Sequence, residues 1–251
     1  MLALEFPPIN ELLRWQDIFP TFNKVALIAV LATLITSAIF LMAARQDGLK
    51  APKGIRNLAE TIVEFIEKQI ILPTMGSHGM GWTPFLLSIF MFIYLCNLPG
   101  ILPFFQMPAT ARIAIPLFLS LLVWVVFIGV GFKHQGPKYI KNSLFPPGVP
   151  GPLYILVAPI EFISTFLVRP FSLTVRLFAN MLAGHILLVT FALLTQELVQ
   201  SDTIALKPVA ILPFFMLLFL TGFEVLVGFL QAYIFTILAA VYIGGAAHPE
   251  H

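Results

Sequence analysis

The amino-acid sequence predicts an all-α integral membrane protein with about five membrane-crossing helices, because a bilayer span needs about 20 apolar residues. Of its 251 residues, 59% are hydrophobic and only 10% are charged, and the mean hydropathy is +0.96. Soluble domains average about 25% charged residues, so this composition excludes a water-soluble enzyme. We expect one transmembrane domain over residues 1–251, with an interfacial amphipathic helix and a tilted antiparallel hairpin formed by the last two long helices.

Three stretches in the first half are ordinary candidate spans. They cover residues 25–44, 84–105 and 113–132, and none of them contains a charged residue. Each is apolar on every side, which is typical of a helix surrounded by lipid or buried in a bundle.

Residues 54–71, between the first two spans, have two contrasting faces. Ile55, Leu58, Ile62, Phe65, Ile66 and Ile70 recur at helical spacing on one face. Arg56, Asn57, Glu60, Glu64, Glu67 and Lys68 occupy the other face. This pattern predicts an amphipathic helix lying in the membrane interface, and a helix packed on a soluble partner is the alternative.

The second half predicts a hairpin of two helices that are too long for a simple crossing. Residues 153–197 contain the prolines Pro159 and Pro170, which can kink a helix, and residues 209–244 carry a single charge, Glu224. Because each stretch far exceeds the roughly 20 residues of one span, the helices must tilt, kink or extend past the bilayer.

Basic residues in two loops predict the orientation. Arg45, Lys50, Lys53 and Arg56 follow the first span, and Lys133, Lys138 and Lys141 follow the third. Loops rich in lysine and arginine face the cytoplasm. We therefore expect the N-terminus outside and, after five crossings, the C-terminus in the cytoplasm.

Several classes of function are excluded or unsupported. The net charge of +2 provides no basic field for nucleic acid. The single cysteine, Cys96, allows neither a disulfide framework within the chain nor a cysteine metal cluster. No phosphate-binding GxxxxGK[ST] loop and no HExxH zinc motif occurs, so we expect no nucleotide site, no metal and no cofactor.

Arg176 is the exceptional residue, because an arginine near the bilayer centre costs about 2.5–3.5 kcal/mol and cannot readily lose its proton. Residues at equal depth in an antiparallel pair have nearly constant index sums. One register therefore places Arg176 beside Gln231 and His185 beside Glu224, with Asn180 one helical turn from Arg176. The four polar residues then form two layers.

The two layers differ in chemistry. A histidine beside a carboxylate, His185 with Glu224, can relay protons, whereas Arg176 is a fixed positive charge. This predicts a half-channel that ends at an electrostatic barrier. Glu161 and hydroxyls such as Ser172 could line an access path from the cytoplasm. The alternatives are a structural salt bridge for Arg176, a satisfied His–Glu pair, a local cap for Glu161, and hydroxyls bonded back to their own helix.

Two long runs resemble subunit a of F-type ATP synthases. APIEFISTFLVRPFSLTVRLFANMLAGH, at residues 158–185, resembles its signature helix, and FEVLVGFLQAYIFTILAAVYIG, at residues 223–244, resembles its last helix. NLPGILPFF in the second span also fits. The resemblance implies that Arg176 faces a rotating ring of c subunits as carboxylate partner and leak barrier. It implies that Asn180, His185, Glu224 and Gln231 belong to the proton pathway.

The resemblance implies the stator subunit of a rotary enzyme, which provides two offset proton half-channels to the c-ring and couples proton translocation to rotation and ATP synthesis. The expected partners are the c-ring, a b-type peripheral stalk subunit, the whole ATP synthase complex, protons and the bilayer. The chain itself would be non-catalytic.

The absence of a targeting segment favours a bacterial plasma membrane over the mitochondrial inner membrane. Three other classes of function stay open. An autonomous secondary transporter would use Arg176 to bind an anionic substrate, and it predicts an inverted repeat, which the sequence lacks. A structural membrane scaffold would have no ion path. An intramembrane hydrolase would need a serine paired with His185.

Overall fold

The computed structural model describes residues 17–19, 22–45, 54–102, 108–145, 153–201 and 203–247, and nearly all of these residues are helical. Five helical segments in this part of the chain are long and apolar enough to cross a membrane. They are Lys24–Ala44, Ser77–Gly100, Ala114–Gln135, Tyr154–Gln200 and Leu206–Ala247. The chain is therefore a multi-pass helical membrane protein, and the predicted fold class is confirmed.

The first spanning helix is α2 (Lys24–Ala44). It begins after Asn23, whose side-chain oxygen accepts a hydrogen bond of 3.0 Å from the backbone N–H of Ala26. This cap satisfies one of the amide groups that the first helical turn leaves without a partner. Two very short antiparallel strands, β1 (Asp17–Phe19) and β2 (Phe22–Asn23), precede it and were not predicted.

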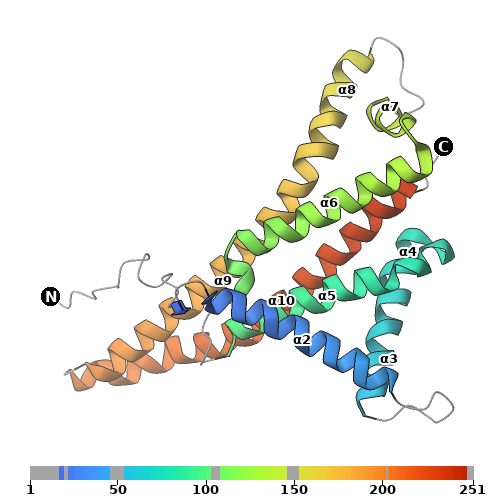
Figure 1. Cartoon of the computed structure of the whole chain (residues 1–251). Coiled ribbons are helices and arrows are strands. Elements are labelled where there is room, and N and C mark those ends of the chain that lie inside the picture. Colours follow the sequence, from blue (N-terminus) through green and yellow to red (C-terminus); the bar gives the residue numbers. More distant parts are fainter. Residues whose placement is uncertain are drawn as a thin grey trace.

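The amphipathic segment is longer and less regular than a single α-helix. It consists of α3 (Ile55–Ile66), a π-helical turn η1 (Glu67–Ile71) and α4 (Leu72–Met75). Its apolar face is buried at Ile66, Ile70 and Ile71, while ion pairs join Arg56 to Glu60 and Lys68 to Glu64 on the exposed face. Figure 1 shows α3 running across the end of α2, against which it packs.

The core is built around α5 (Thr83–Asn97) and α6 (Ala114–Gln135). Two short 3-10 turns, η2 (Ser77–Trp82) and η3 (Leu98–Gly100), flank α5, and a third, η4 (Ala109–Ala111), precedes α6. Leu86, Ile93, Val123 and Phe127 are almost fully buried where α5 and α6 meet the hairpin. The predicted end of the second span, at residues 103–105, lies outside the described residues.

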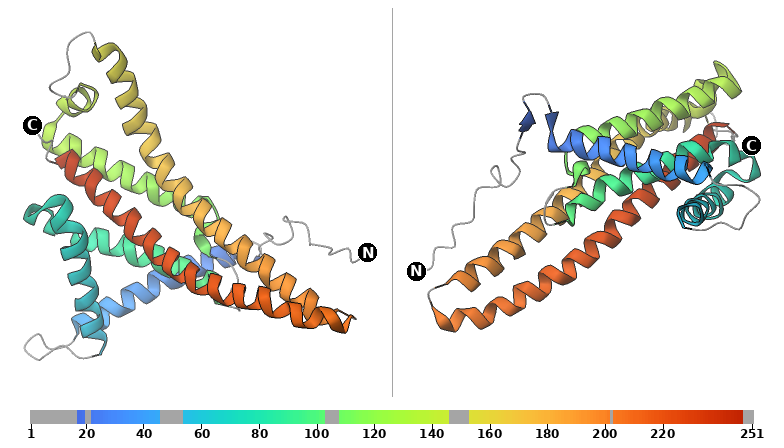
Figure 2. Two further views of the ribbon diagram at one scale, coloured as in Figure 1. Left: turned by 180° about the vertical axis from the view of Figure 1, so that it is seen from behind. Right: turned by 60° about the horizontal axis from the view of Figure 1, so that its bottom comes forward.

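The long hairpin begins with α8 (Tyr154–Ile163), a π-helical turn η6 (Ser164–Val168) and α9 (Arg169–Gln200), which follow one another without a break. The turn η7 (Ile204–Ala210) leads into α10 (Ile211–Ala247). Figure 2 shows α9 and α10 running side by side in opposite directions, with their connected ends projecting beyond the other helices.

A short helix, α7 (Lys138–Leu144), folds back after α6. The ring of Tyr139 lies against Gly131 of α6, where a Cβ atom would come within 2.4 Å of it. This close approach brings α7 to the same end of the bundle as the last turns of α10 (Figure 1).

Large apolar side chains cover much of the outer surface. Ile155 of α8 is 84% exposed, and Leu212, Phe215 and Phe219 of α10 are also well exposed. Soluble monomers rarely expose contiguous apolar patches of more than a few hundred square ångströms. This surface therefore suits contact with lipid or with other membrane helices.

Candidate functional site

Glu224 of α10 is the most unusual polar residue of the hairpin. It is only 6% exposed, and neither of its carboxylate oxygens has a hydrogen-bond partner in the part of the chain that the structure describes. Buried polar groups without partners are rare in folded proteins, and those that occur mark hydrated or functional sites. Glu224 is therefore a candidate for exchange with water or protons.

A cavity of a few hundred cubic ångströms has room for several waters, since one water takes about 30 Å³ of liquid volume. The cavity beside Glu224 measures about 370 Å³, and its lining includes Asn180 and Gly184 of α9 and Gln231 of α10. The structure therefore brings three of the predicted pathway residues, Asn180, Glu224 and Gln231, to one cavity between α9 and α10.

Gly184 makes room for the Glu224 carboxyl group. A Cβ atom at Gly184 would lie 3.1 Å from Oε1 of Glu224 and 3.3 Å from its carboxyl carbon. Contacts of 3.0–3.4 Å are tighter than nine in ten real Cβ contacts, so a residue larger than glycine would require the Glu224 carboxyl group to shift by a few tenths of an ångström. The contact also supports the predicted register, because Gly184 directly precedes His185.

His185 is buried, with 4% exposure, but it does not line this cavity. No hydrogen bond joins it to Glu224, whose oxygens lack partners among the described residues. The structure therefore places the two residues at neighbouring levels of the hairpin without pairing them directly.

Arg176 lies on the outside of the chain. Its side chain is exposed, as is that of Asn180, whereas Gln231 on α10 is 7% exposed. Arg176 forms no hydrogen bond or ion pair with any residue that the structure describes. Its charge is therefore presented to whatever lies beside the hairpin.

A buried polar cluster one turn from Glu224 was not anticipated from the sequence. Nδ2 of Asn97 in α5 donates a hydrogen bond of 3.2 Å to the backbone carbonyl of Gly228 in α10. Thr110 in η4 donates to Oδ1 of Asn97. A lone asparagine in an apolar span was the available signal, but the sequence did not show which helix it meets.

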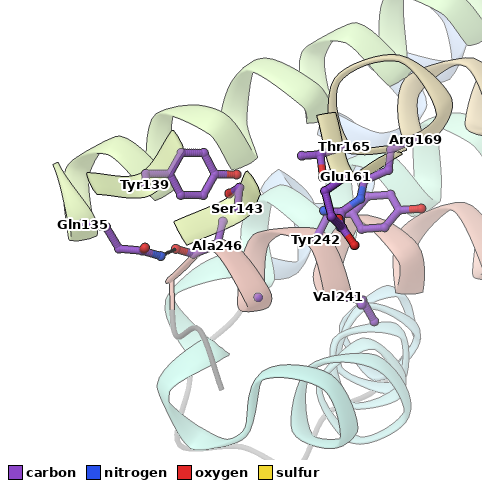
Figure 3. A pocket seen from close by; sticks show the side chains of 10 residues that line it. Gln135, Tyr139, Ser143, Glu161, Thr165, Arg169, Val241, Tyr242 and Ala246 are labelled. Carbon is purple, nitrogen blue, oxygen red and sulfur yellow. Dashed lines mark hydrogen bonds between the residues drawn. The ribbon is translucent and has the colours of Figure 1, made fainter. Parts of the chain in front are cut away.

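A second cavity, of about 320 Å³, lies at the other end of the hairpin (Figure 3). Glu161, Thr165 and Arg169 of the α8–α9 segment line it together with Tyr242 of α10. Tyr139 and Ser143 of α7 and Gln135 of α6 complete its polar lining. Glu161 was predicted to lie on an access path, whereas Arg169 and the two tyrosines were not assigned to it.

Tyr139 contributes a neutral phenol to this second cavity. Burial raises the pKa of the Tyr139 phenol, while a hydrogen bond with Ser143 and the positive charge of Arg169 act in the opposite direction. A tyrosine with a raised pKa stays protonated at neutral pH, because its ordinary pKa is already near 10. It can donate a hydrogen bond but carries no charge.

Two hydroxyl residues of α9, the predicted Ser172 and its neighbour Thr174, have different surroundings. Ser172 is half-buried and lines neither of the two cavities. Thr174 lies 2.5 Å from the hydroxyl of Ser120 in α6 and also donates to the backbone carbonyl of Pro170. Thr174 therefore ties α9 to α6.

The described residues contain no group of three or more histidine, cysteine, aspartate or glutamate side chains that could hold a metal ion. The fold and the site together define a class: a multi-pass helical membrane protein with two cavities, each lined in part by polar residues, along a long hairpin and an arginine exposed on that hairpin.

Comparisons with known proteins identify the family. The family described as "ATP synthase A chain" matches residues 25–244. The chain is 41% identical to ATP synthase subunit a of Frankia alni over 232 residues, which is 91% of this chain and 79% of that protein. It is 41% identical to ATP synthase subunit a of a Chelativorans species over 231 residues, 92% of this chain and 90% of that protein. The chain therefore belongs to the ATP synthase A chain family.

Proposed function

We propose that this chain is the membrane stator subunit of a rotary F-type ATP synthase and that it provides two offset proton half-channels to a ring of c subunits. The observation that carries the proposal is the position of the two cavities. Residues 161, 165 and 169 line one cavity and precede Arg176, whereas residues 180 and 184 line the other and follow it. The cavities thus flank Arg176 along one continuous helical segment.

In the direction of ATP synthesis, protons enter from outside through the region of His185 and Glu224. The unpaired Glu224 carboxyl group supports this entry, as do Asn180 and Gln231, which line the same cavity. Each proton passes to a carboxylate on the ring, and the ring then carries the neutral acid through lipid. After a turn, the proton leaves through the second cavity beside Glu161.

Arg176 separates the two half-channels. An opposite charge favours the ionised form of a carboxyl group, so Arg176 releases the proton from each ring carboxyl that reaches it. Arginine itself cannot relay a proton under these conditions, so it blocks a direct leak between the cavities. Its exposed position on the hairpin supports a partner outside this chain.

The rest of the chain fits the same role. The long tilted hairpin can follow the curved wall of the ring, and the exposed face of α3, with Glu60 and Glu64, can dock a b-type stalk subunit. We further propose a single transmembrane domain in a bacterial plasma membrane, with the N-terminus outside and the C-terminus in the cytoplasm, as the basic loops indicate.

The test compares the chain alone with the whole complex. Purified chain in liposomes and the intact ATP synthase in liposomes are both assayed for proton movement with a pH-sensitive dye. We expect ATP-driven acidification only with the complex, and loss of that pumping when the complex is prepared without this chain. Uptake of an anionic substrate by the chain alone would instead support an autonomous transporter that uses Arg176, and would contradict the stator role.

A further inference from the structure

Arg169 is a second arginine on the hairpin, and it lines the cavity of about 320 Å³ beside Glu161. We call this cavity the inner cavity. Its guanidinium carbon lies 5.0 Å from the centre of the Tyr242 ring and 6.0 Å from the centre of the Phe127 ring. Both distances are within the range of a cation–π contact. The guanidinium is therefore held between α10 and α6, where Figure 3 shows it beside Glu161 and Tyr242.

The π-helical turn η6 explains why Glu161 and Arg169 share this cavity. At about 100° per residue, eight α-helical steps would leave the two side chains about 80° apart around the helix. A π-helical turn accommodates one extra residue, so the eight steps act as seven and the offset falls to about 20°. Thr165, midway between them, is buried and lines the same cavity.

Contacts with α6 hold this turn in place. The ring of Phe166, within η6, meets the ring of Trp124 of α6 edge to face, with 6.5 Å between their centres. This contact and the buried side chain of Thr165 fix the rotation of the segment. The shared face of Glu161 and Arg169 is therefore a property of the packed structure.

The titratable groups that line the inner cavity are Glu161, Arg169, Tyr139 and Tyr242. No ion pair within 4.0 Å joins Glu161 to Arg169, although the structure describes both residues. A cavity of about 320 Å³ leaves room for several waters between them. Arg169 and Glu161 therefore line one space that water can fill.

The position of Arg169 relative to Arg176 also matters. The spacing 169, 172, 176 places both arginines on one face of α9, about 10 Å apart along its axis. The cavity thus has a fixed positive charge about two helical turns from Arg176.

Resting on the function proposed above, we propose that Arg169 is a positioning residue of the inner half-channel, which orients the cavity water and the Glu161 carboxylate for proton exit. The proton leaves the ring carboxyl, passes to cavity water, is taken up by the Glu161 carboxylate and is then released to bulk water. Arg169 keeps its own proton throughout, so Glu161 is the acceptor and Arg169 directs the proton toward it.

The test measures passive proton conductance of membrane vesicles that contain the whole complex, after the soluble catalytic part is stripped off, from pH 6 to pH 9 by a pH-sensitive dye. Arg169→Gln and Glu161→Gln should each lower conductance about tenfold, by analogy with the lower end of the loss when the hydrogen-bond partner of a metal ligand is removed. The double variant should be no slower than either single variant, and Arg169→Gln should change the pH profile. Arg112→Gln, an exposed arginine outside the cavity, is the matched control.

The proposal would be overturned if the conductance losses of the two single variants multiplied in the double variant. It would also be overturned if Arg169→Gln in an assembled complex had normal conductance and an unchanged pH profile. If Arg169→Gln does not assemble, Arg169→Lys decides, because lysine keeps the charge without the flat stacked guanidinium. A several-fold loss is expected, and normal conductance would contradict the assigned role. An Arg176→Ala complex tested in parallel distinguishes the role of Arg169 from the proposed stator function. If Arg176→Ala abolishes ATP-driven proton pumping while the Arg169 variants behave normally, only the role of Arg169 is contradicted.

Discussion

At the scale of single residues, the Glu224 carboxyl group occupies a space that its neighbours leave open and has no hydrogen bond to a described side chain. Gly184 has no side chain to fill the space of the carboxyl group, and no described side chain offers that group a hydrogen bond. A carboxyl group that the chain itself does not satisfy depends on what enters its cavity. Small changes beside it should therefore affect proton movement more than folding.

Gly184→Ala tests this environment. The added Cβ atom would lie 3.1 Å from Oε1 of Glu224, so the carboxyl group must shift. We expect ATP-driven pumping in inverted vesicles to fall several-fold while the complex still assembles. Gly222→Ala on α10 is the control, because a Cβ atom there meets nothing within 4 Å. Equal pumping by the two variants would show that the position of the Glu224 carboxyl group is unimportant.

Asn97→Leu tests the buried cluster that joins α5 to α10. The change removes the bond to the Gly228 carbonyl and leaves the buried Thr110 hydroxyl without its acceptor, and an unsatisfied buried polar group costs about 1–3 kcal/mol. We expect a lower thermal unfolding temperature of the purified complex. Ser88→Ala, which removes an exposed hydroxyl bonded to its own helix, should leave that temperature unchanged. An unchanged unfolding temperature for the Asn97→Leu variant would mean that the cluster does not stabilise the bundle.

At the scale of helices and turns, irregular segments position the cavities. The π-helical turn η6 aligns Glu161 with Arg169, and the short helix α7 closes the inner cavity with Tyr139 and Ser143. Both depend on close contacts with α6. The inner cavity should therefore be sensitive to changes in α6 that touch neither Glu161 nor Arg169.

Gly131→Ala in α6 tests this dependence. An added Cβ atom would come within 2.4 Å of the Tyr139 ring, so α7 must move away from α6. We expect faster proteolysis of the α6–α7 connection and a lower proton conductance. Gly129→Ala, in the same helix but with nothing within 4 Å of the added atom, should behave like the unaltered chain. A Gly131→Ala variant with normal proteolysis and conductance would refute the role of α7.

The spans could be predicted from the sequence because bilayer thickness alone sets their length and composition. Helices such as α2 and α6 lie close to the predicted residues 25–44 and 113–132. The β1–β2 pair and the two π-helical turns could not be predicted, because they depend on packing that an apolar pattern does not record.

The site could be predicted only in part, for a related reason. Antiparallel register arithmetic is consistent with the shared cavity of Asn180, Glu224 and Gln231, since depth in a hairpin follows from residue number. The same arithmetic says nothing of rotation about the helix axis. Nor does it say what lies opposite each level: residues of α6, α7 and α10 surround Arg169, whereas Arg176, on the same face of α9, is exposed. Asn97 and Tyr139 come from elements whose neighbours the sequence did not specify.

At the scale of the whole molecule, the hairpin is a surface that needs partners. Its connected end projects beyond the other helices (Figure 2). Large apolar side chains such as Phe215 and Phe219 are exposed along it. Arg176 is exposed in the middle of this surface and has no ion-pair partner among the described residues. In the function proposed above, its counter-charge comes from another subunit. The proposed ring carboxylate supplies that charge.

The most direct measurement is ATP-driven acidification of inverted membrane vesicles that carry Arg176→Ala, with assembly checked by co-purification of the complex. Arg112→Ala is the control, since it removes an exposed arginine outside both cavities. We predict that the Arg176→Ala complex assembles fully and does not pump, because no fixed charge then separates the half-channels. Normal pumping by an assembled Arg176→Ala complex would contradict the account.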